Sequence, residues 1–247
     1  MKRVACLSFS LCVLLFSCKK SDDNSNGQQF IGCELSKMVD SSDALGIHAI
    51  TSVSYDISGA MITSTTTGTT SVSRSLDYSS GSNPLIRISG SYSETDTLTL
   101  ANGKITMIVA HNYSNTQNNK RSFYNYDASG QLQTRMDFYA NGTLDTAYYT
   151  WANGDMISVQ SRLDSFKYTY DTLKSQDGDW LRENQILIMG LGRTIITTQH
   201  EVHSVQHGLN APTYFFYIKD ANNRIVTCNA YTGSSLEVYT YSYYCTQ

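Results

Sequence analysis

Polar and apolar residues alternate along residues 124–171, and three tight-turn signals divide this stretch: Ser129-Gly130, Asn141-Gly142 and Asn153-Gly154. The runs between the turns are rich in Tyr, Phe, Thr, Ile and Val, which suit a pleated surface. Turn residues that tolerate a positive φ, placed between alternating runs, are typical of β-hairpins. The pattern therefore predicts an antiparallel meander.

The alternation is cleanest over residues 131–138. The two predicted faces of this strand carry, respectively, Leu132, Thr134, Met136 and Phe138, and Gln131, Gln133, Arg135 and Asp137. A period of two with one polar face predicts a sheet that is covered on one side only.

Similar turn signals recur along the rest of the chain and predict about fifteen strands, without a long helix. Residues 175–183 form the longest excursion between strands, and two further apolar strands are expected around residues 190–192. An open sheet of so many strands would expose its pairing edges. We therefore expect residues 30–247 to form a single all-β domain, an antiparallel meander that is strongly curled or closed into a barrel.

The N-terminal residues carry the pattern of an export signal. Lys2 and Arg3 precede an apolar run over residues 4–16 that is too short to span a bilayer, which predicts a signal peptide over residues 1–17. The run ends in Leu-Phe-Ser followed by Cys18, which resembles a bacterial lipobox and implies acylation of Cys18. The alternative is an ordinary signal peptide with a chance cysteine.

Residues 18–29 are polar and small, so we expect a flexible tether between the lipid and the domain. The acidic pair Asp22-Asp23 resembles a surface-export signal of Bacteroidota lipoproteins. It implies that outer-membrane lipid holds the protein through acylated Cys18, with the domain facing the exterior. The alternative is a tether with two incidental acids.

The charge of the mature chain argues against nucleic acid as a partner. Loss of Lys2 and Arg3 with the signal leaves 16 of the 18 basic residues against 21 acidic ones, a net charge of −5. Binding to nucleic acid needs a basic stripe. The 18 tyrosines against 8 phenylalanines favour sheets with partly solvated faces.

Three cysteines remain once two leave with the signal and Cys18 is acylated: Cys33, Cys228 and Cys245. A hairpin turning near residues 232–233 would set Cys228 opposite Glu237, so we favour a disulfide from Cys33 to Cys245, with Cys228 as the alternative partner. Such a long closed loop would contribute roughly 3–5 kcal/mol.

The turn segments YDISGAMI, YDASGQLQ, YANGTLDT, WANGDMIS and KDANNRIV resemble one another and are similar to the Tyr-Asp repeats of Rhs-type proteins. Together with the lipobox, the acidic tether and the final alternating tyrosines with a cysteine, they resemble a group of Bacteroidota lipoproteins without an assigned function. The resemblance implies a porin-like β fold and carries over no catalytic residue.

His200, His203 and His207 form the densest group of metal-capable side chains. On a strand His203 and His207 would share a face, and with Glu201 they could hold zinc, copper or nickel. The alternative, which we favour, is a set of exposed histidines, and no cofactor is expected.

Two other groups of residues suggest chemistry. Asp145, Asp155, Asp164 and Asp171 lie at predicted strand ends, where paired carboxylates could cleave a glycoside. Trp151 and Trp180 could stack on sugar rings, although packing between strands is the commoner role of such aromatics. The chain lacks a Gly-x-Ser-x-Gly elbow, a His-Glu-x-x-His motif and a phosphate-binding glycine loop.

The sequence favours a lipid-anchored, non-enzymatic binding or scaffold module, with a glycan or an outer-membrane protein as its partner. The alternative is a surface hydrolase or metal-dependent enzyme. Strands rich in Thr, Ser, Asn and Gln cannot supply a continuous apolar band to lipid, so we expect the domain to lie outside the bilayer.

Overall fold

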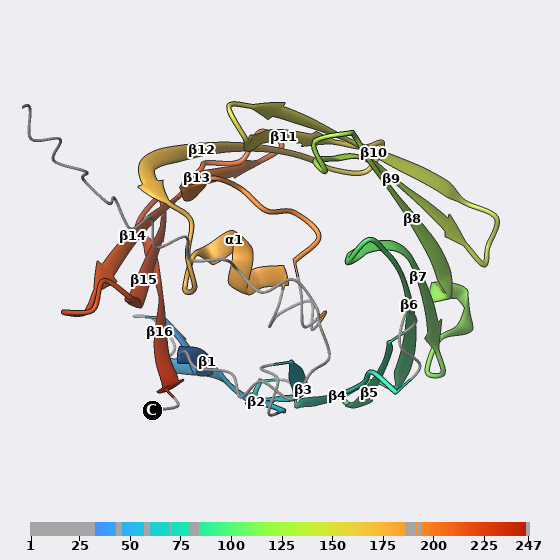
Figure 1. Cartoon of the computed structure of the whole chain (residues 1–247), viewed down its shortest axis with the longest axis horizontal. Coiled ribbons are helices and arrows are strands. Elements are labelled where there is room, and N and C mark those ends of the chain that lie inside the picture. Colours follow the sequence, from blue (N-terminus) through green and yellow to red (C-terminus); the bar gives the residue numbers. More distant parts are fainter. Residues whose placement is uncertain are drawn as a thin grey trace, which may run out of the picture.

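A computed structural model describes residues 33–42, 46–56, 60–69, 71–79, 84–185, 191 and 194–245. The predicted signal peptide, Cys18 and the tether at residues 18–29 lie outside the described residues. The described residues form a closed antiparallel barrel of sixteen strands, each paired with the next along the chain (Figure 1). This confirms the predicted all-β meander, its closure into a barrel, and nearly its number of strands.

The elements in chain order are β1 Cys33–Ser42, β2 Gly46–Tyr55, β3 Met61–Gly68, β4 Val72–Asp77, β5 Leu85–Gly90, β6 Glu94–Ala101, β7 Lys104–Asn112, the 3₁₀ turn η1 Thr116–Asn118, β8 Lys120–Tyr126, β9 Leu132–Tyr139, β10 Leu144–Ala152, β11 Asp155–Gln160, β12 Ser165–Lys174, the short helix α1 Trp180–Glu183, β13 His200–His207, β14 Thr213–Lys219, β15 Ile225–Thr232 and β16 Ser235–Cys245. In the described residues, no helix is long and apolar enough to cross a bilayer.

The three turns that define the meander form as predicted. Gly130, Gly142 and Gly154 adopt φ values of 82°, 83° and 82°. Residues with a Cβ rarely adopt this left-handed backbone conformation, which explains why glycine occupies the second position of each turn. The twelve-residue pitch is therefore one strand plus one turn.

The barrel closes where β1 pairs with β16, with Cys33 opposite Cys245. A disulfide joins these two residues, with an S–S distance of 2.01 Å, which is the pairing that the sequence favoured. Cys228 is buried and free. It lies opposite Tyr239 rather than Glu237, because Thr232 pairs directly with Ser235 across a two-residue turn.

The lumen of the barrel serves as its hydrophobic core. Inward-facing aliphatic side chains are almost fully buried, among them Met61, Leu76, Ile86, Leu98 and Ile108. The residues that alternate with them along β3–β6 face outward and are mostly hydroxyl-bearing: Thr63, Thr65, Ser73, Ser75, Ser89, Thr95, Thr97 and Thr99. Alternation thus gives this part of the wall a polar exterior and a chiefly apolar interior, in which Ser64, Arg74 and Asp96 are also buried.

Strand β9 follows the predicted orientation at Leu132, which is 1% exposed, but reverses it after an irregularity in the β8–β9 pairing between Asn125 and Tyr126. Phe138 is 45% exposed and faces outward, whereas Asp137 is 1% exposed and faces the lumen. Arg135 forms an ion pair with Asp137 (3.0 Å) inside the wall. The irregularity shifts the register by one residue, so the polar positions beyond it turn inward, where Arg135 accompanies the buried Asp137.

The predicted excursion between β12 and β13 is present and carries α1 inside the ring of strands (Figure 1). Asp179 is fully buried and accepts hydrogen bonds from the backbone N–H groups of Leu181, Arg182 and Val202, so it caps α1 and ties it to β13. Of the two strands expected around residues 190–192, the second corresponds to β13, which begins later than expected, at His200. Residues 186–190 and 192–193 lie outside the described residues.

Candidate binding pocket in the barrel lumen

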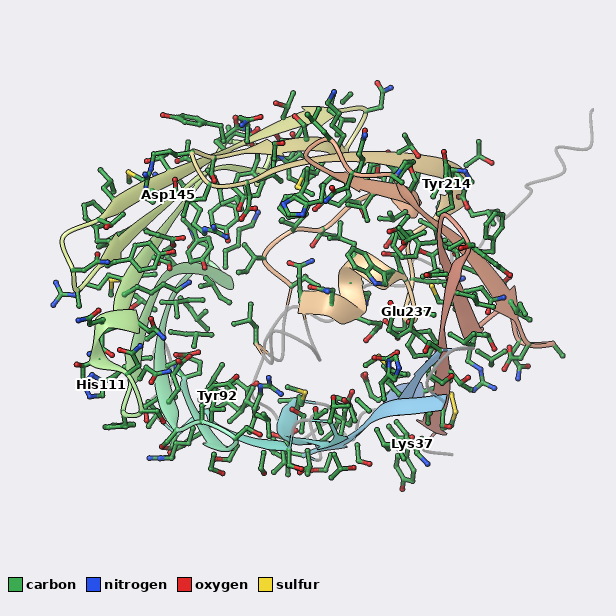
Figure 2. The ribbon with its side chains drawn as sticks, turned by 180° about the vertical axis from the view of Figure 1, so that it is seen from behind. Lys37, Tyr92, His111, Asp145, Tyr214 and Glu237 are labelled. Atoms are coloured by element: carbon green, nitrogen blue, oxygen red, sulfur yellow. A yellow bond between two sulfur atoms is a disulfide. The ribbon has the colours of Figure 1, made fainter. Side chains whose placement is uncertain are left out.

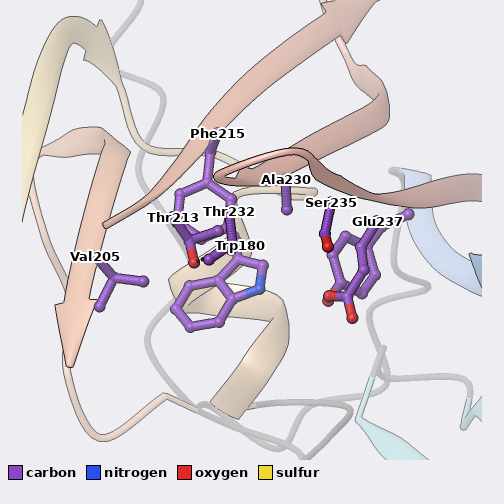
Figure 3. Close-up of a pocket in the computed structure, with 9 residues that line it drawn as sticks. Trp180, Val205, Thr213, Phe215, Ala230, Thr232, Ser235 and Glu237 are labelled. Atoms are coloured by element: carbon purple, nitrogen blue, oxygen red, sulfur yellow. Dashed lines mark hydrogen bonds between the residues drawn. The ribbon is translucent and has the colours of Figure 1, made fainter. Parts of the chain in front are cut away.

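A cavity of about 210 Å³ lies inside the barrel, near the rim that carries the β13–β14 and β15–β16 turns (Figure 3). Its lining combines aromatic rings, hydroxyl groups and one carboxylate: Trp180, Val205, Thr213, Phe215, Ala230, Thr232, Ser235, Glu237 and Tyr239.

The cavity follows from the register of three neighbouring strands. Phe215, Ala230 and Glu237 lie side by side across β14, β15 and β16 on the inward face. The small Ala230 side chain between two large ones leaves a hollow, because nothing else in that row fills the space. The next row, Thr213, Thr232 and Ser235, supplies three hydroxyl groups at the rim.

Helix α1 supplies the aromatic wall of the pocket. Trp180 stacks on Phe215, with ring centroids 4.7 Å apart. Its backbone N–H donates to the hydroxyl of Tyr217 (3.4 Å), which itself donates to the backbone carbonyl of Val202 (2.8 Å). These contacts hold the indole against the barrel wall.

Tyr239 and Glu237 form a fixed polar pair on β16. The Tyr239 hydroxyl donates a hydrogen bond to Oε2 of Glu237 (2.9 Å). Burial and the neighbouring Glu237 raise the pKa of Tyr239 well above its ordinary value, so its hydroxyl stays protonated. The carboxylate of Glu237 lies on the inner side of the wall (Figure 2).

A second carboxyl group lies next to this pair. Asp40 on β1 is in register with Tyr239, and its Oδ1 is buried without a hydrogen-bond partner among the described residues. Burial, then the charge of Glu237, raises the pKa of Asp40, while His48 acts in the opposite direction. His48 itself contacts the Ser42 hydroxyl through Nε2 (3.0 Å). This side of the lumen is therefore negative.

The three histidines proposed as metal ligands do not come together. His200 contacts Asp155 through Nδ1 (2.7 Å), and His207 contacts Asp164 through Nε2 (2.8 Å). His203 lies against the outward rings of Tyr214 and Phe216.

An irregularity in the β12–β13 pairing between Thr169 and Tyr170 shifts the register by one residue. His203 lies beside the outward rings of Tyr214 and Phe216, whereas His207 stacks on Phe166, with ring centroids 4.6 Å apart. The prediction that His203 and His207 share a face is therefore wrong. Within the described ranges, no three His, Cys, Asp or Glu side chains gather into a metal-binding group.

The four strand-end carboxylates also have separate roles, and none of them lines the pocket. Asp155 accepts backbone N–H groups of Gln199 and His200, and Asp145 accepts that of Arg162. Asp164 contacts His207, and Asp171 accepts the N–H of Leu173. They are turn and loop acceptors.

Of the two tryptophans predicted to stack on sugars, one lines the pocket. Trp180 does so, whereas Trp151 is half-buried in the wall and donates its Nε1–H to the carbonyl of Leu132 (2.7 Å). The prediction omitted Glu237 and Tyr239. The period of two in β16 was the available signal, because it places Ser235, Glu237 and Tyr239 on one face.

A separate aromatic surface lies on the outside of β14 and β15. Tyr214, Phe216 and Tyr231 are 42%, 50% and 38% exposed, although Phe215 between the first two is buried. The rings of Phe216 and Tyr231 meet edge to face, 5.5 Å apart. Tyr214 marks this outer side of the wall in Figure 2.

These features define a closed sixteen-stranded barrel with buried side chains in its lumen and a small pocket near one rim. A porin-like protein from Bacteroides uniformis ATCC 8492 shares this fold, with a TM-score of 0.58 and 12% sequence identity over 85% of this chain and 96% of that one. A porin-like protein from Bacteroides vulgatus ATCC 8482 matches with a TM-score of 0.42 and 13% identity over 88% and 99%, which is too low a score to argue from. No family model and no curated protein sequence matches the chain.

Proposed function

We propose that the protein is a non-enzymatic binding module that acylated Cys18 holds at the outer membrane. Its barrel stands in water and binds a small, hydroxyl-rich ligand in the lumen pocket. The observation that carries the proposal is the hollow over Ala230, where Trp180, Tyr239 and Glu237 meet three hydroxyl groups.

The polarity of the wall supports a barrel outside the bilayer. A transmembrane barrel turns an apolar band about 25 Å tall toward lipid and keeps a polar lumen. Over β3–β6 this protein does the reverse, with Thr65, Ser75 and Thr97 outside and Ile86 and Leu98 inside. Large apolar side chains do face outward elsewhere, among them Phe138 on β9 and Phe216 and Ile218 on β14. A lipid anchor would provide an attachment to the membrane that does not depend on them.

The direction of the strands supports a pocket that opens away from the membrane. The predicted tether joins the barrel at the rim of Cys33, whereas the pocket lies near Ser235 at the opposite end of β16. The ten residue steps from Ser235 to Cys245 span roughly 30 Å along the strand. A ligand could thus enter from the side remote from the anchor.

The size and chemistry of the pocket favour a single ring. Its volume of about 210 Å³ is below the roughly 300–1,000 Å³ of sites for drug-sized ligands. Aromatic faces suit the apolar face of a sugar ring, and the hydroxyls of Thr213, Thr232 and Ser235 can donate to or accept from its hydroxyl groups. One terminal sugar of a glycan fits this description.

The pocket supports binding rather than catalysis. Glycoside hydrolysis requires two carboxyl groups that flank the scissile bond. In the described part of the chain, Glu237 is the single carboxylate that lines the pocket.

A test is to screen the chain that begins at Lys19, which retains the whole barrel, against a glycan array and a set of monosaccharides. We expect Ala230→Leu, which fills the hollow, and Trp180→Phe to weaken binding at least about tenfold. Trp151→Phe is the matched control and should bind normally, because its indole lies outside the pocket. Thermal unfolding checks that each variant folds.

Three outcomes would overturn the proposal. One is the absence of any ligand in the screen. Another is binding that survives both Ala230→Leu and Trp180→Phe. The last is turnover of a glycoside by the unmodified chain.

A further inference from the structure

We infer that the lumen pocket selects a ligand that carries a positive charge, which narrows the ligand class to single rings bearing an ammonium group, such as amino sugars. This inference rests on the proposed function and adds the sign of the ligand's charge. It follows from the pocket, two carboxyl groups on neighbouring strands, and the aromatic rings between them.

The hydrogen bond from Tyr239 defines the role of Glu237. The Tyr239 hydroxyl donates a hydrogen bond to Oε2 of Glu237 (2.9 Å). This hydrogen bond orients the carboxylate of Glu237, an exposed residue at the rim, and leaves Oε1 to accept from a ligand. Within the described ranges, no Lys, Arg or His forms an ion pair with Glu237.

Asp40 adds a second carboxyl group on the same side of the lumen. It faces inward from β1, directly across from Tyr239, and its Oδ1 has no hydrogen-bond partner in the described chain. Burial and then the charge of Glu237 raise the pKa of Asp40, because the two carboxyl groups lie on neighbouring strands. The nearest basic group on this side is His48, on β2.

The aromatic lining also suits a cation. Trp180, Phe215 and Tyr239 border the cavity, and a cation over such a ring, best over Trp, is attracted by its negative face. An anionic ligand would meet Glu237 and Asp40 as like charges. A neutral sugar would satisfy the hydroxyls but leave both carboxyl groups without a counter-charge. An ammonium group supplies the missing partner.

The test compares three probes that share one ring and differ at one substituent: glucosamine, N-acetylglucosamine and glucose. Titration calorimetry on the chain from Lys19 should show glucosamine binding at least about tenfold more tightly than the two neutral sugars. Glu237→Gln should remove this preference, because the amide still accepts from Tyr239 but carries no charge. Asp171→Asn, which alters a carboxylate outside the pocket by the same charge, should leave the preference unchanged.

The outcomes separate this inference from the proposed function. Equal binding of all three sugars, or a preference that survives Glu237→Gln, overturns the inference and leaves a pocket for neutral sugars. Failure of all three probes, together with an empty glycan screen, overturns the proposed function and the inference with it.

Discussion

Cys33 and Cys245 lie directly opposite each other, and their disulfide joins the first strand of the barrel to the last. The bond closes a loop with a sequence separation of 212 residues. A barrel has no free edge only while this first-to-last pairing holds. The disulfide therefore stabilises the contact that completes the fold.

Removal of this bond should destabilise the barrel. We expect Cys33→Ser with Cys245→Ser to lower the free energy of unfolding by about 3–5 kcal/mol, because the unfolded chain regains a long loop. Chemical denaturation with and without reductant measures the effect. Reductant should lower the stability of the wild type but not of the double variant; equal stability of the two oxidised proteins would contradict the assignment.

Stability should rise as the pH falls from about pH 8 to about pH 5.5. Burial raises the pKa of Glu183 from 4.5 to about 7, and raises that of Glu34 equally far. The native state then binds more protons than the unfolded chain over this interval. This stabilising contribution is complete below the pKa that the two carboxyl groups have in the unfolded chain. It is lost as the pH rises through their native pKa of about 7.

Glu183→Gln should flatten this pH dependence, because the amide can still accept from the N–H of Gly178 but does not titrate. The measurement is the unfolding temperature at both pH values, with Asp171→Asn as a control. Each kcal/mol of change in the unfolding free energy should change the unfolding temperature by about 2–4 °C. A wild-type unfolding temperature that is lower at the acidic pH would contradict the account.

Two glycines should differ sharply when replaced by alanine. Both adopt a positive φ, 83° at Gly142 and 90° at Gly178. A Cβ at Gly142 would meet nothing within 4 Å, so Gly142→Ala should cost about 1–2 kcal/mol from backbone strain alone.

A Cβ at Gly178 would lie 2.7 Å from the Cβ of Ile225, so Gly178→Ala should cost about 1–3 kcal/mol more than Gly142→Ala. Urea denaturation compares the two variants. Equal costs would mean that the segment before α1 does not pack against β15.

The ion pair between Lys219 and Glu201 should be sensitive to the loss of one partner. Lys219 Nζ lies 2.7 Å from Oε1 of Glu201, whose side chain is fully buried and also accepts from Gln176. Lys219→Met should cost about 3–5 kcal/mol, because it leaves an uncompensated buried charge. The double variant with Glu201→Gln should recover much of this loss in a denaturation series. No recovery would show that the cost arises from packing.

The fold was predictable because it follows from two local signals, the turn residues and the alternation of polar and apolar residues. The turns at Gly130, Gly142 and Gly154 and the alternation between them determine antiparallel neighbours, and edge avoidance then favours closure. The orientation of β9 was not predictable, because an irregularity in its pairing with β8 shifts the register by one residue and turns Arg135 and Asp137 inward. Alternation alone cannot show which face is inward.

The candidate site was predictable only in part. The acidic residues of the segment 175–183 are typical of a solvated loop, but Asp179 and Glu183 accept hydrogen bonds from backbone N–H groups inside the barrel. Trp180 could be singled out from the sequence alone, because an aromatic ring can stack on a sugar ring. The hollow over Ala230 depends on the register of three strands, which a single sequence does not determine.

The central claim is that the barrel stands in water with its apolar side chains in the lumen. The most direct measurement is the behaviour of the chain from Lys19 to Gln247 in buffer without detergent. We predict a soluble, β-rich protein that unfolds cooperatively and does not insert into lipid vesicles. A chain that folds only in detergent, or that becomes protease-protected in vesicles, would contradict the account.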